Sequence, residues 1–255
     1  MDATRPVEER GAPRKPWFGV PCCPPNLSRL FASLGDYFYS ARPEGVTVNL
    51  YGANAATIPV GGQPVGIKQA TSYPWDGKIS ITVSPKAPAT FALALRVPGW
   101  VQGRPVASDL YRYLNDQSEP VRISINGTPF TSKPENGFVT ISREWKSGDK
   151  VELDLPMAIR RVVAHESVLN LRGLVALERG PVVYCIEAPD NGGAVRNLIL
   201  PDSVALKAEH QPALLGGVTV LRGANLTAIP YAVWNNRGFA DMTVWIPREP
   251  GKSAF

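Results

Sequence analysis

The sequence has few of the residues that define several common protein classes. Its three cysteines in 255 residues are too few for the disulfide framework of a small secreted domain. It contains two histidines, His165 and His210, and because neither lies at a spacing typical of metal ligands, we interpret both as surface or packing residues. No apolar run approaches the roughly 18 residues of a membrane-spanning helix, so we expect no membrane partner.

Positive charge is present but is not concentrated. Lys and Arg number 27 against 22 Asp and Glu, which gives a net charge of +5 and a pI of about 9.2. A nucleic-acid-binding protein concentrates its basic residues in a patch or stripe, whereas here they are scattered. The densest pairs, Arg14-Lys15 and Arg160-Arg161, are interpreted as solvated surface. We therefore expect no nucleic-acid partner.

The first 17 residues, MDATRPVEERGAPRKPW, are polar and lack the apolar core of a signal peptide. A cytoplasmic location is favoured for this reason, unless the natural N-terminus lies further upstream. The stretch does not have the pattern of an element that begins a fold. It resembles a loop that follows a preceding segment.

One helix is predicted, directly after two adjacent cysteines. Apolar residues recur from Leu27 to Phe38 with the spacing i, i+3, i+4, i+7 and i+11, which is typical of one face of a helix. The prolines at positions 24 and 25 are compatible with a first helical turn. Pro43 disfavours helical geometry at the residue before it, so the helix is expected to end near residues 40–43.

The rest of the chain predicts β-structure. Glycine and proline are abundant, with 23 and 25 residues, and short runs of alternating apolar and polar residues are separated by turns. The Asn126-Gly127 pair is the strongest hairpin signal. The expected strands are residues 46–51, 78–83, 91–97, 121–125, 138–141, 150–155, 174–177, 182–186, 218–221 and 242–246.

Two of the three cysteines, Cys22 and Cys23, are adjacent and immediately precede the predicted helix. Such a pair cannot close a loop with itself, so a metal site, a reactive thiolate and no function at all are the open interpretations. The positive end of the helix dipole favours a thiolate, and thiolates suit zinc, but two cysteines supply only half of a tetrahedral site. From these residues alone, an inert pair is weighted as heavily as a functional one. Cys185, in the apolar run VVYCI, is interpreted as a buried strand residue.

Several motifs together resemble one enzyme family. The segment WFGVPCCPPNLSRLFASLGDYFYS at residues 17–40 resembles the segment that closes the catalytic barrel in glycoside hydrolase family 127, the β-L-arabinofuranosidases. The likeness continues through YPWDG, LRVPGW, LERGPVVYC, IPYAVWNNRG and VWIPR, which begin at residues 73, 95, 177, 229 and 244. It therefore covers nearly the whole chain.

The resemblance implies an unusual mechanism, since most retaining glycosidases use two carboxylates. In this family a zinc-bound cysteine thiolate attacks the anomeric carbon, and a glutamate acts first as general acid and then as general base. Carried over, Cys22 would be the nucleophile and a zinc ligand, and Cys23 would be a second zinc ligand. The family's other zinc ligands, its acid/base glutamate and its sugar-binding histidines lie upstream of this motif. No acid/base residue is therefore expected in this chain, and its substrate-binding residues are not identified.

The same resemblance implies a mostly β fold class with a helical start. We expect residues 1–43 to be the remnant of a truncated (α/α)6 barrel that ends with the predicted helix. Residues 44–160 would form a first β-sandwich domain of jelly-roll type. Residues 161–255 would form a second β-sandwich domain, with a C-terminal tail that could return to the first. The chain is thus expected to be the C-terminal part of a longer enzyme.

Other residues in these motifs have simpler interpretations. Five aromatic residues could form a sugar-stacking face, but core packing is the commoner role of aromatic residues in sandwiches. They are Tyr73, Trp75, Trp100, Trp234 and Trp245. Asp76 and Glu178 are expected to have turn and ion-pair roles, because proline, glycine and arginine are their neighbours.

Three functions are compatible with the sequence. The first is part of a zinc- and thiol-dependent glycosidase acting on an arabinofuranoside-type oligosaccharide or glycoconjugate, inactive as the isolated chain. The second is a non-catalytic β-sandwich module that binds or supports carbohydrate. The third, a redox-active dithiol protein, would need a βαβ context that is absent. In the first case, the apolar face of helix 27–39 would pack against the missing barrel segment or a second copy of the chain.

Overall fold

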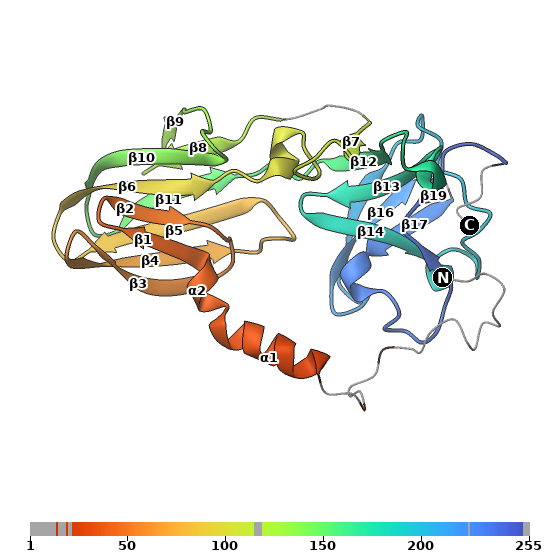
Figure 1. The fold of residues 1–255 in the computed structure, drawn as a ribbon, viewed down its shortest axis with the longest axis horizontal. Helices are drawn as coiled ribbons and strands as arrows, with labels where there is room; N and C mark the ends of the chain where they lie inside the picture. The colour runs from red at the N-terminus through yellow and green to blue at the C-terminus, as the bar shows by residue number, and fades with distance from the viewer. Residues whose placement is uncertain (1–13, 15–18, 20–21, 115–118, 224, 252–255) are drawn as a thin grey trace. The chain divides into compact units, whose positions relative to one another are not determined.

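The structure is a computed structural model of the chain and describes residues 14, 19, 22–114, 119–223 and 225–251. The chain divides into two compact units (Figure 1). The first unit comprises Phe18–Gln102 and Ser118–Met157, and the second unit comprises Met1–Trp17, Gly103–Gln117 and Ala158–Phe255. The described part is mostly β-structure, as predicted. The domain boundaries at residues 43 and 160, and the barrel remnant before residue 44, stay predictions.

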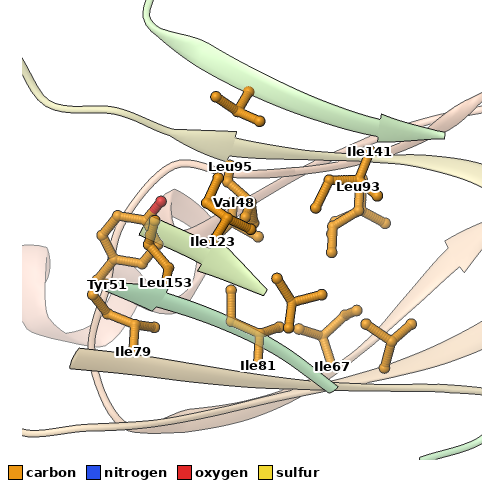
Figure 2. Packing of buried hydrophobic residues seen from close by; sticks show 14 of the residues in the cluster. Val48, Tyr51, Ile67, Ile79, Ile81, Leu93, Leu95, Ile123, Ile141 and Leu153 are labelled. Carbon is orange, nitrogen blue, oxygen red and sulfur yellow. The ribbon is translucent and has the colours of Figure 1, made fainter. Parts of the chain in front are cut away.

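In the first unit, two β-sheets enclose one apolar core (Figure 2). Neighbouring strands are antiparallel, except that β2 (Gly45–Val48) and β6 (Ala89–Arg96) are parallel. The four-stranded sheet has the order β1 (Tyr39–Arg42), β2, β6, β10 (Phe138–Trp145). The six-stranded sheet has the order β3 (Asn54–Val60), β4 (Gln63–Thr71), β5 (Lys78–Pro85), β11 (Asp149–Asp154), β8 (Arg122–Ile125), β9 (Thr128–Phe130).

The core of the first unit follows from the alternation of side chains along each strand. In β5, Ile79, Ile81 and Val83 are buried, whereas the residues between them are partly exposed. Ile79 and Ile81 face Leu93 and Leu95 of β6 across the core (Figure 2). A period of two in the sequence therefore places one apolar row of each strand inside, which is why these strands could be predicted.

The helical part of the first unit is α1 (Cys23–Ser33), followed by the short α2 (Gly35–Phe38). The predicted helix is confirmed, but its predicted end near residues 40–43 is wrong, because Tyr39–Arg42 form strand β1 and pair with β2. The backbone of Tyr39 is extended, and its hydroxyl donates to Asn54 Oδ1 at 2.7 Å, so tertiary contacts override the helical pattern here. No residue of α1 is buried.

The second unit contains one antiparallel sheet. One of its strands, β7 (Tyr111–Tyr113), lies in the sequence between β6 and β8 of the first unit. The predicted strand 242–246 is two short strands, because Thr243 and Trp245 close a bend between them: the Thr243 hydroxyl donates to the Trp245 carbonyl at 2.9 Å. The order is β15 (Lys207–Gln211), β16 (Val218–Gly223), β17 (Leu226–Pro230), β14 (Val182–Glu187), β13 (Leu174–Arg179), β12 (Ile159–Ala164), β7 (Tyr111–Tyr113), with β18 (Met242–Thr243) on β14 and β19 (Ile246–Pro247) on β13.

Short 3-10 helices complete the fold. They are η2 (Gly99–Gln102) in the first unit, and η3 (Leu169–Leu171), η4 (Ala188–Asp190) and η5 (Tyr231–Val233) in the second. Within the described residues, no helix has the length and apolarity needed to cross a bilayer.

Candidate functional site

The adjacent cysteines lie at the start of α1. Cys22 is the N-cap residue and already has helical backbone angles, and Cys23 is the first residue of the helix. Pro24 lies in the first turn, where a missing N–H leaves no hydrogen bond unmade. The Asn26 side chain donates to the Cys22 carbonyl at 2.9 Å, which holds the turn that presents both thiols. Both cysteines are free thiols and both are exposed to solvent.

The separation of the two thiols fits a shared metal ion. Their Sγ atoms are 3.8 Å apart. A tetrahedral zinc ion with Zn–S bonds of about 2.3 Å places two of its sulfur ligands about 3.8 Å apart. Cys22 and Cys23 therefore match one edge of a zinc tetrahedron. In the part of the chain that the structure describes, no group of three or more His, Cys, Asp or Glu side chains could hold a metal, so this pair would supply two of four ligands.

The other cysteine and both histidines lie elsewhere in the fold. Cys185 is buried in β14, as predicted, and burial, followed by the nearby Glu187 and Asp190 carboxylates, raises the pKa of its thiol to about 12. His165 is exposed and its Nδ1 accepts from the Ser167 backbone N–H at 3.2 Å. His210 is exposed on β15, so the interpretation of both histidines as surface residues is confirmed.

Two carboxylates that the sequence singled out have local structural roles. Asp76 accepts a hydrogen bond from the Lys78 backbone N–H at 2.9 Å, which closes the turn before β5. Glu178 of β13 accepts from the Tyr113 hydroxyl at 2.9 Å, and the Arg160 guanidinium carbon lies 4.9 Å from the centre of the Tyr113 ring. Burial raises the pKa of the Glu178 carboxyl. The turn role of Asp76 is therefore confirmed.

The arginine pair on β12 is not solvated surface, which corrects the prediction. Arg160 and Arg161 are only 6% and 7% exposed. The Arg160 guanidinium covers the Tyr113 ring, and Arg161 donates to the Val204 carbonyl at 2.6 Å. Arginine can be buried in this way because its weakly hydrated, planar head stacks on aromatic rings and finds carbonyl acceptors.

The aromatic candidates mostly pack in the cores, as expected. Tyr73 and Trp100 pack against the core of the first unit, while Trp234 and Trp245 pack against apolar clusters of the second unit. Trp75 is the exception, with 40% of its surface exposed. The fold therefore does not bring these five aromatic residues together as a sugar-stacking face within either unit.

A buried ion-pair network in the second unit was not predicted. Glu187, the last residue of β14, is fully buried and accepts from the Asn235 backbone N–H at 2.7 Å and from Arg237 at 2.5 Å. Arg237 also pairs with Asp190 of η4. A glutamate at the end of the apolar run VVYCIE was the available signal, but its arginine partner lies 50 positions further along the chain.

The first unit also contains a groove of about 1040 Å³ whose lining is mostly apolar. Val101, Ile123 and Phe130 line it, and so do Arg122 and Asp154, which form an ion pair at 2.8 Å. A groove of this size could hold a small ligand. No pattern in the sequence indicates this groove, because its lining residues come from segments spread between Ala70 and Asp154.

Comparisons with known proteins agree with the motifs. Residues 45–157 match the description "Beta-L-arabinofuranosidase, GH127 middle domain", and residues 159–247 match "Glycoside hydrolase family 127 C-terminal domain". A non-reducing end β-L-arabinofuranosidase of Bifidobacterium longum subsp. longum is 32% identical over 268 residues, covering 91% of this chain and 38% of that protein.

Solved structures show the same likeness. A GH127 β-arabinofuranosidase has 38% sequence identity and a TM-score of 0.88, over 93% of this chain and 40% of its own. A GH127 β-L-arabinofuranosidase from Geobacillus stearothermophilus T6 has 36% identity and a TM-score of 0.81, over 93% of this chain and 39% of its own. The chain spans about two fifths of the length of these relatives. Two family domains that follow each other over most of the sequence place this chain in glycoside hydrolase family 127.

Proposed function

We propose that this chain is the C-terminal part of a zinc-dependent retaining glycoside hydrolase that acts on β-linked L-arabinofuranosides, with Cys22 as its nucleophile. The observation that carries the proposal is the pair of exposed thiols, 3.8 Å apart at the start of α1, in a chain of this family. The substrate would be an arabinofuranoside-type oligosaccharide or glycoconjugate. The names of the relatives support this substrate class.

In this proposal the reacting group that this chain supplies is the thiolate of Cys22. The Cys22 sulfur attacks the anomeric carbon, and the bond from that carbon to the leaving oxygen breaks as the oxygen takes a proton from a general acid. Water then displaces the sulfur and gives its proton to the same group, which now acts as general base; the thiolate is regenerated, and two inversions give net retention. Cys23 and Cys22 would hold the zinc ion, which would supply charge that keeps the nucleophile as a thiolate. The Asn26 side chain orients the turn.

The general acid and the remaining zinc ligands would come from the rest of a longer enzyme. The exposed face of α1 supports this part of the proposal, because Leu27, Leu30 and Phe31 are 55%, 46% and 69% exposed. Exposure of several apolar side chains on one helix face to water is energetically unfavourable. We therefore expect another protein surface to cover them. A barrel segment of the longer enzyme is the expected occupant, and a second copy of the chain is the alternative.

Hydrolysis of an aryl β-L-arabinofuranoside tests the proposal. A longer enzyme that contains this chain should bind about one zinc ion and lose turnover on Cys22→Ala, while its fold survives. Cys185→Ala is the matched control and should keep turnover, because this thiol is buried in β14. The 255-residue chain alone should show negligible hydrolysis. Wild-type turnover by Cys22→Ala would refute the nucleophile assignment.

A non-catalytic carbohydrate-binding module is the second candidate, and the groove of the first unit favours it. Under this alternative the chain would still bind arabinan fragments after both exposed cysteines, Cys22 and Cys23, are replaced by serine. Phe130→Ala, which removes an apolar wall of the groove, would weaken that binding. If titration calorimetry detects no binding of arabinan fragments by the unchanged chain or by the double serine variant, the carbohydrate-binding function is excluded.

A further inference from the structure

The chain contains three Asn-Gly pairs, and the fold holds their asparagine side chains differently. The pairs lie at residues 126–127, 136–137 and 191–192. An asparagine side chain reacts with the backbone nitrogen that follows it most readily when the next residue is glycine, because glycine has no Cβ to hinder the approach. In the folded chain, the reaction also depends on how firmly the side-chain amide is held.

Two of the pairs form nearly identical turns. Asn126 and Asn136 both have a φ angle of 51°, and the glycines that follow them have φ angles of 79° and 84°. The first turn joins β8 to β9, and the second is closed by the pairing of Glu135 with Phe138. Both asparagines are exposed to solvent. The φ angles of the turn and the access of solvent therefore do not distinguish the two amides.

Their hydrogen bonds do distinguish them. The Asn126 Nδ2 donates to Asp149 Oδ1 at 2.8 Å, and the Asn126 Oδ1 accepts from the Lys150 backbone N–H at 2.8 Å. Of the residues that the structure describes, none forms a hydrogen bond with the Asn136 side chain. The Asn126 amide must therefore break two hydrogen bonds before it can react, one of them with a carboxylate, whereas the Asn136 amide breaks none.

The third asparagine, Asn191, ends the short helix η4 and is also held. Its Nδ2 donates to the Glu187 carbonyl at 2.8 Å and to the Thr227 carbonyl at 2.9 Å. Its Oδ1 accepts from the Thr227 backbone N–H at 2.9 Å, and the residue is half-buried. The three Asn-Gly pairs thus comprise two whose amides are fixed by the fold and one whose amide is exposed to solvent and can turn.

We propose that Asn136 is a site of spontaneous deamidation in the folded chain, and that Asn126 and Asn191 are protected from this reaction. The Gly137 backbone nitrogen gives its proton to a base in the solvent and bonds to the Asn136 Cγ. The bond from Cγ to Nδ2 breaks, and this nitrogen takes up a proton and leaves as ammonia. The product is a cyclic succinimide. Water then opens the ring at one of its two carbonyl carbons, which gives an aspartyl or an isoaspartyl residue.

The modification would alter one wall of the groove in the first unit. Pro134 and Val139, on either side of the turn, both line the groove. Val97, which also lines it, donates its backbone N–H to the Gly137 carbonyl at 2.7 Å. Both products add a negative charge, and the isoaspartyl product also lengthens the main chain by one carbon. The hairpin could not keep its present hydrogen bonds unchanged after such an insertion. This inference does not depend on the proposed function.

Peptide mass spectrometry of the 255-residue chain tests the proposal. The chain is kept in warm, mildly alkaline buffer and digested in acid, and the replacement of NH by oxygen is followed over time at the three Asn-Gly pairs of the same sample. In the folded chain, Asn136 should react at least about tenfold faster than Asn126 or Asn191, the size expected when two hydrogen bonds must break first. In urea, where only the local sequence distinguishes them, the three pairs should react at similar rates.

Two variants provide matched controls. Asp149→Ala removes the acceptor of the Asn126 Nδ2 and should speed the reaction at Asn126 several-fold without changing the rate at Asn136. Asn136→Gly suits the positive φ angle and should abolish the fast release of ammonia. Equal rates at Asn126 and Asn136 in the folded chain would refute the proposal. So would a folded chain in which Asn136 stays intact while the chain in urea reacts.

Discussion

Replacing Glu187 by glutamine should destabilise the second unit strongly. The Glu187 side chain is fully buried, and it accepts from the Asn235 backbone N–H and from the Arg237 guanidinium. Glutamine is nearly isosteric but carries no charge, and its amide NH₂ would face one of these two donors. A hydrogen bond to a charged group contributes about 1.5–3 kcal/mol, and breaking a buried ion pair costs about 3–5 kcal/mol.

The lower part of that range applies, because Arg237 keeps Asp190 as a partner and is 25% exposed. We expect the free energy of unfolding of the second unit to fall by about 2–3 kcal/mol. Hydrogen exchange of the amides in β13 and β14 measures this unit separately from the first. Amides that exchange by unfolding of the unit should exchange about 30- to 150-fold faster, since 1.4 kcal/mol is a factor of ten.

The control for this experiment is an exposed ion pair of the same unit. Glu209 of β15 pairs with Arg222 of β16 at 2.8 Å, and both side chains are about half exposed, at 51% and 50%. Glu209→Gln should therefore change the stability by less than about 1 kcal/mol. If Glu187→Gln and Glu209→Gln changed exchange equally, burial would not be the source of the network's strength and the reasoning would be refuted.

Three further predictions concern the first unit. Asp149 accepts a hydrogen bond from the Lys146 backbone N–H at 2.9 Å, and this bond lowers the pKa of the Asp149 carboxyl. The stability that this carboxylate adds to the folded state is therefore complete above the ordinary aspartate pKa. It is lost as the pH falls through the lower pKa of the folded protein. Asp149→Asn should thus cost about 1 kcal/mol in urea unfolding at pH 7 and nothing in strong acid, and a cost independent of pH would contradict this origin. Trp145→Phe removes the buried indole N–H that donates to the Phe91 carbonyl at 3.0 Å and should cost about 2–3 kcal/mol in the same assay, whereas a loss below about 0.5 kcal/mol would show that the bond adds nothing. Phe31→Ser should reduce the binding of a hydrophobic dye by the 255-residue chain, because Phe31 is 69% exposed on α1, and equal dye binding by both proteins would place the apolar surface elsewhere.

Local patterns were enough to predict several of the strands and one hairpin, although β3, β4, β12 and β17 were among the strands that they missed. The alternation in residues 78–83 reports directly which side chains of β5 face the core. The Asn126-Gly127 pair forms the turn between β8 and β9 with positive φ angles of 51° and 79°, as a tight hairpin requires. In both cases the information lies within a few residues, so no knowledge of the rest of the fold is needed.

The features that sequence patterns missed depend on distant partners. β1 continues the helical pattern in sequence, yet it becomes a strand because β2 offers it backbone hydrogen bonds. β7 pairs with β12 of the second unit, although it lies in the sequence between strands β6 and β8 of the first unit. The Arg237 partner of Glu187 and the Trp234 partner of Arg14 are likewise remote in sequence. Such contacts follow from the topology, which short-range periodicity does not determine.

The exposed cysteine pair shows both sides of this contrast. The motif CCPPN identified Cys22 and Cys23 from sequence, and the structure adds the 3.8 Å separation of their sulfurs. The prolines of the first turn and the hydrogen bond from the Asn26 side chain to the Cys22 carbonyl account for the backbone turn at this pair. The ligands that would complete a tetrahedral site are not among the described residues, and neither pattern nor geometry within this chain identifies them.

The most direct test of the proposed chemistry is to look for the sugar on the sulfur. A longer enzyme that turns over an aryl β-L-arabinofuranoside is mixed with it briefly and quenched in acid, and the peptides are analysed by mass spectrometry. The proposal predicts one pentosyl group on the peptide that contains Cys22, attached through sulfur and absent from the Cys22→Ala variant. A pentosyl group on a carboxylate, with Cys22 unmodified during turnover, would contradict it.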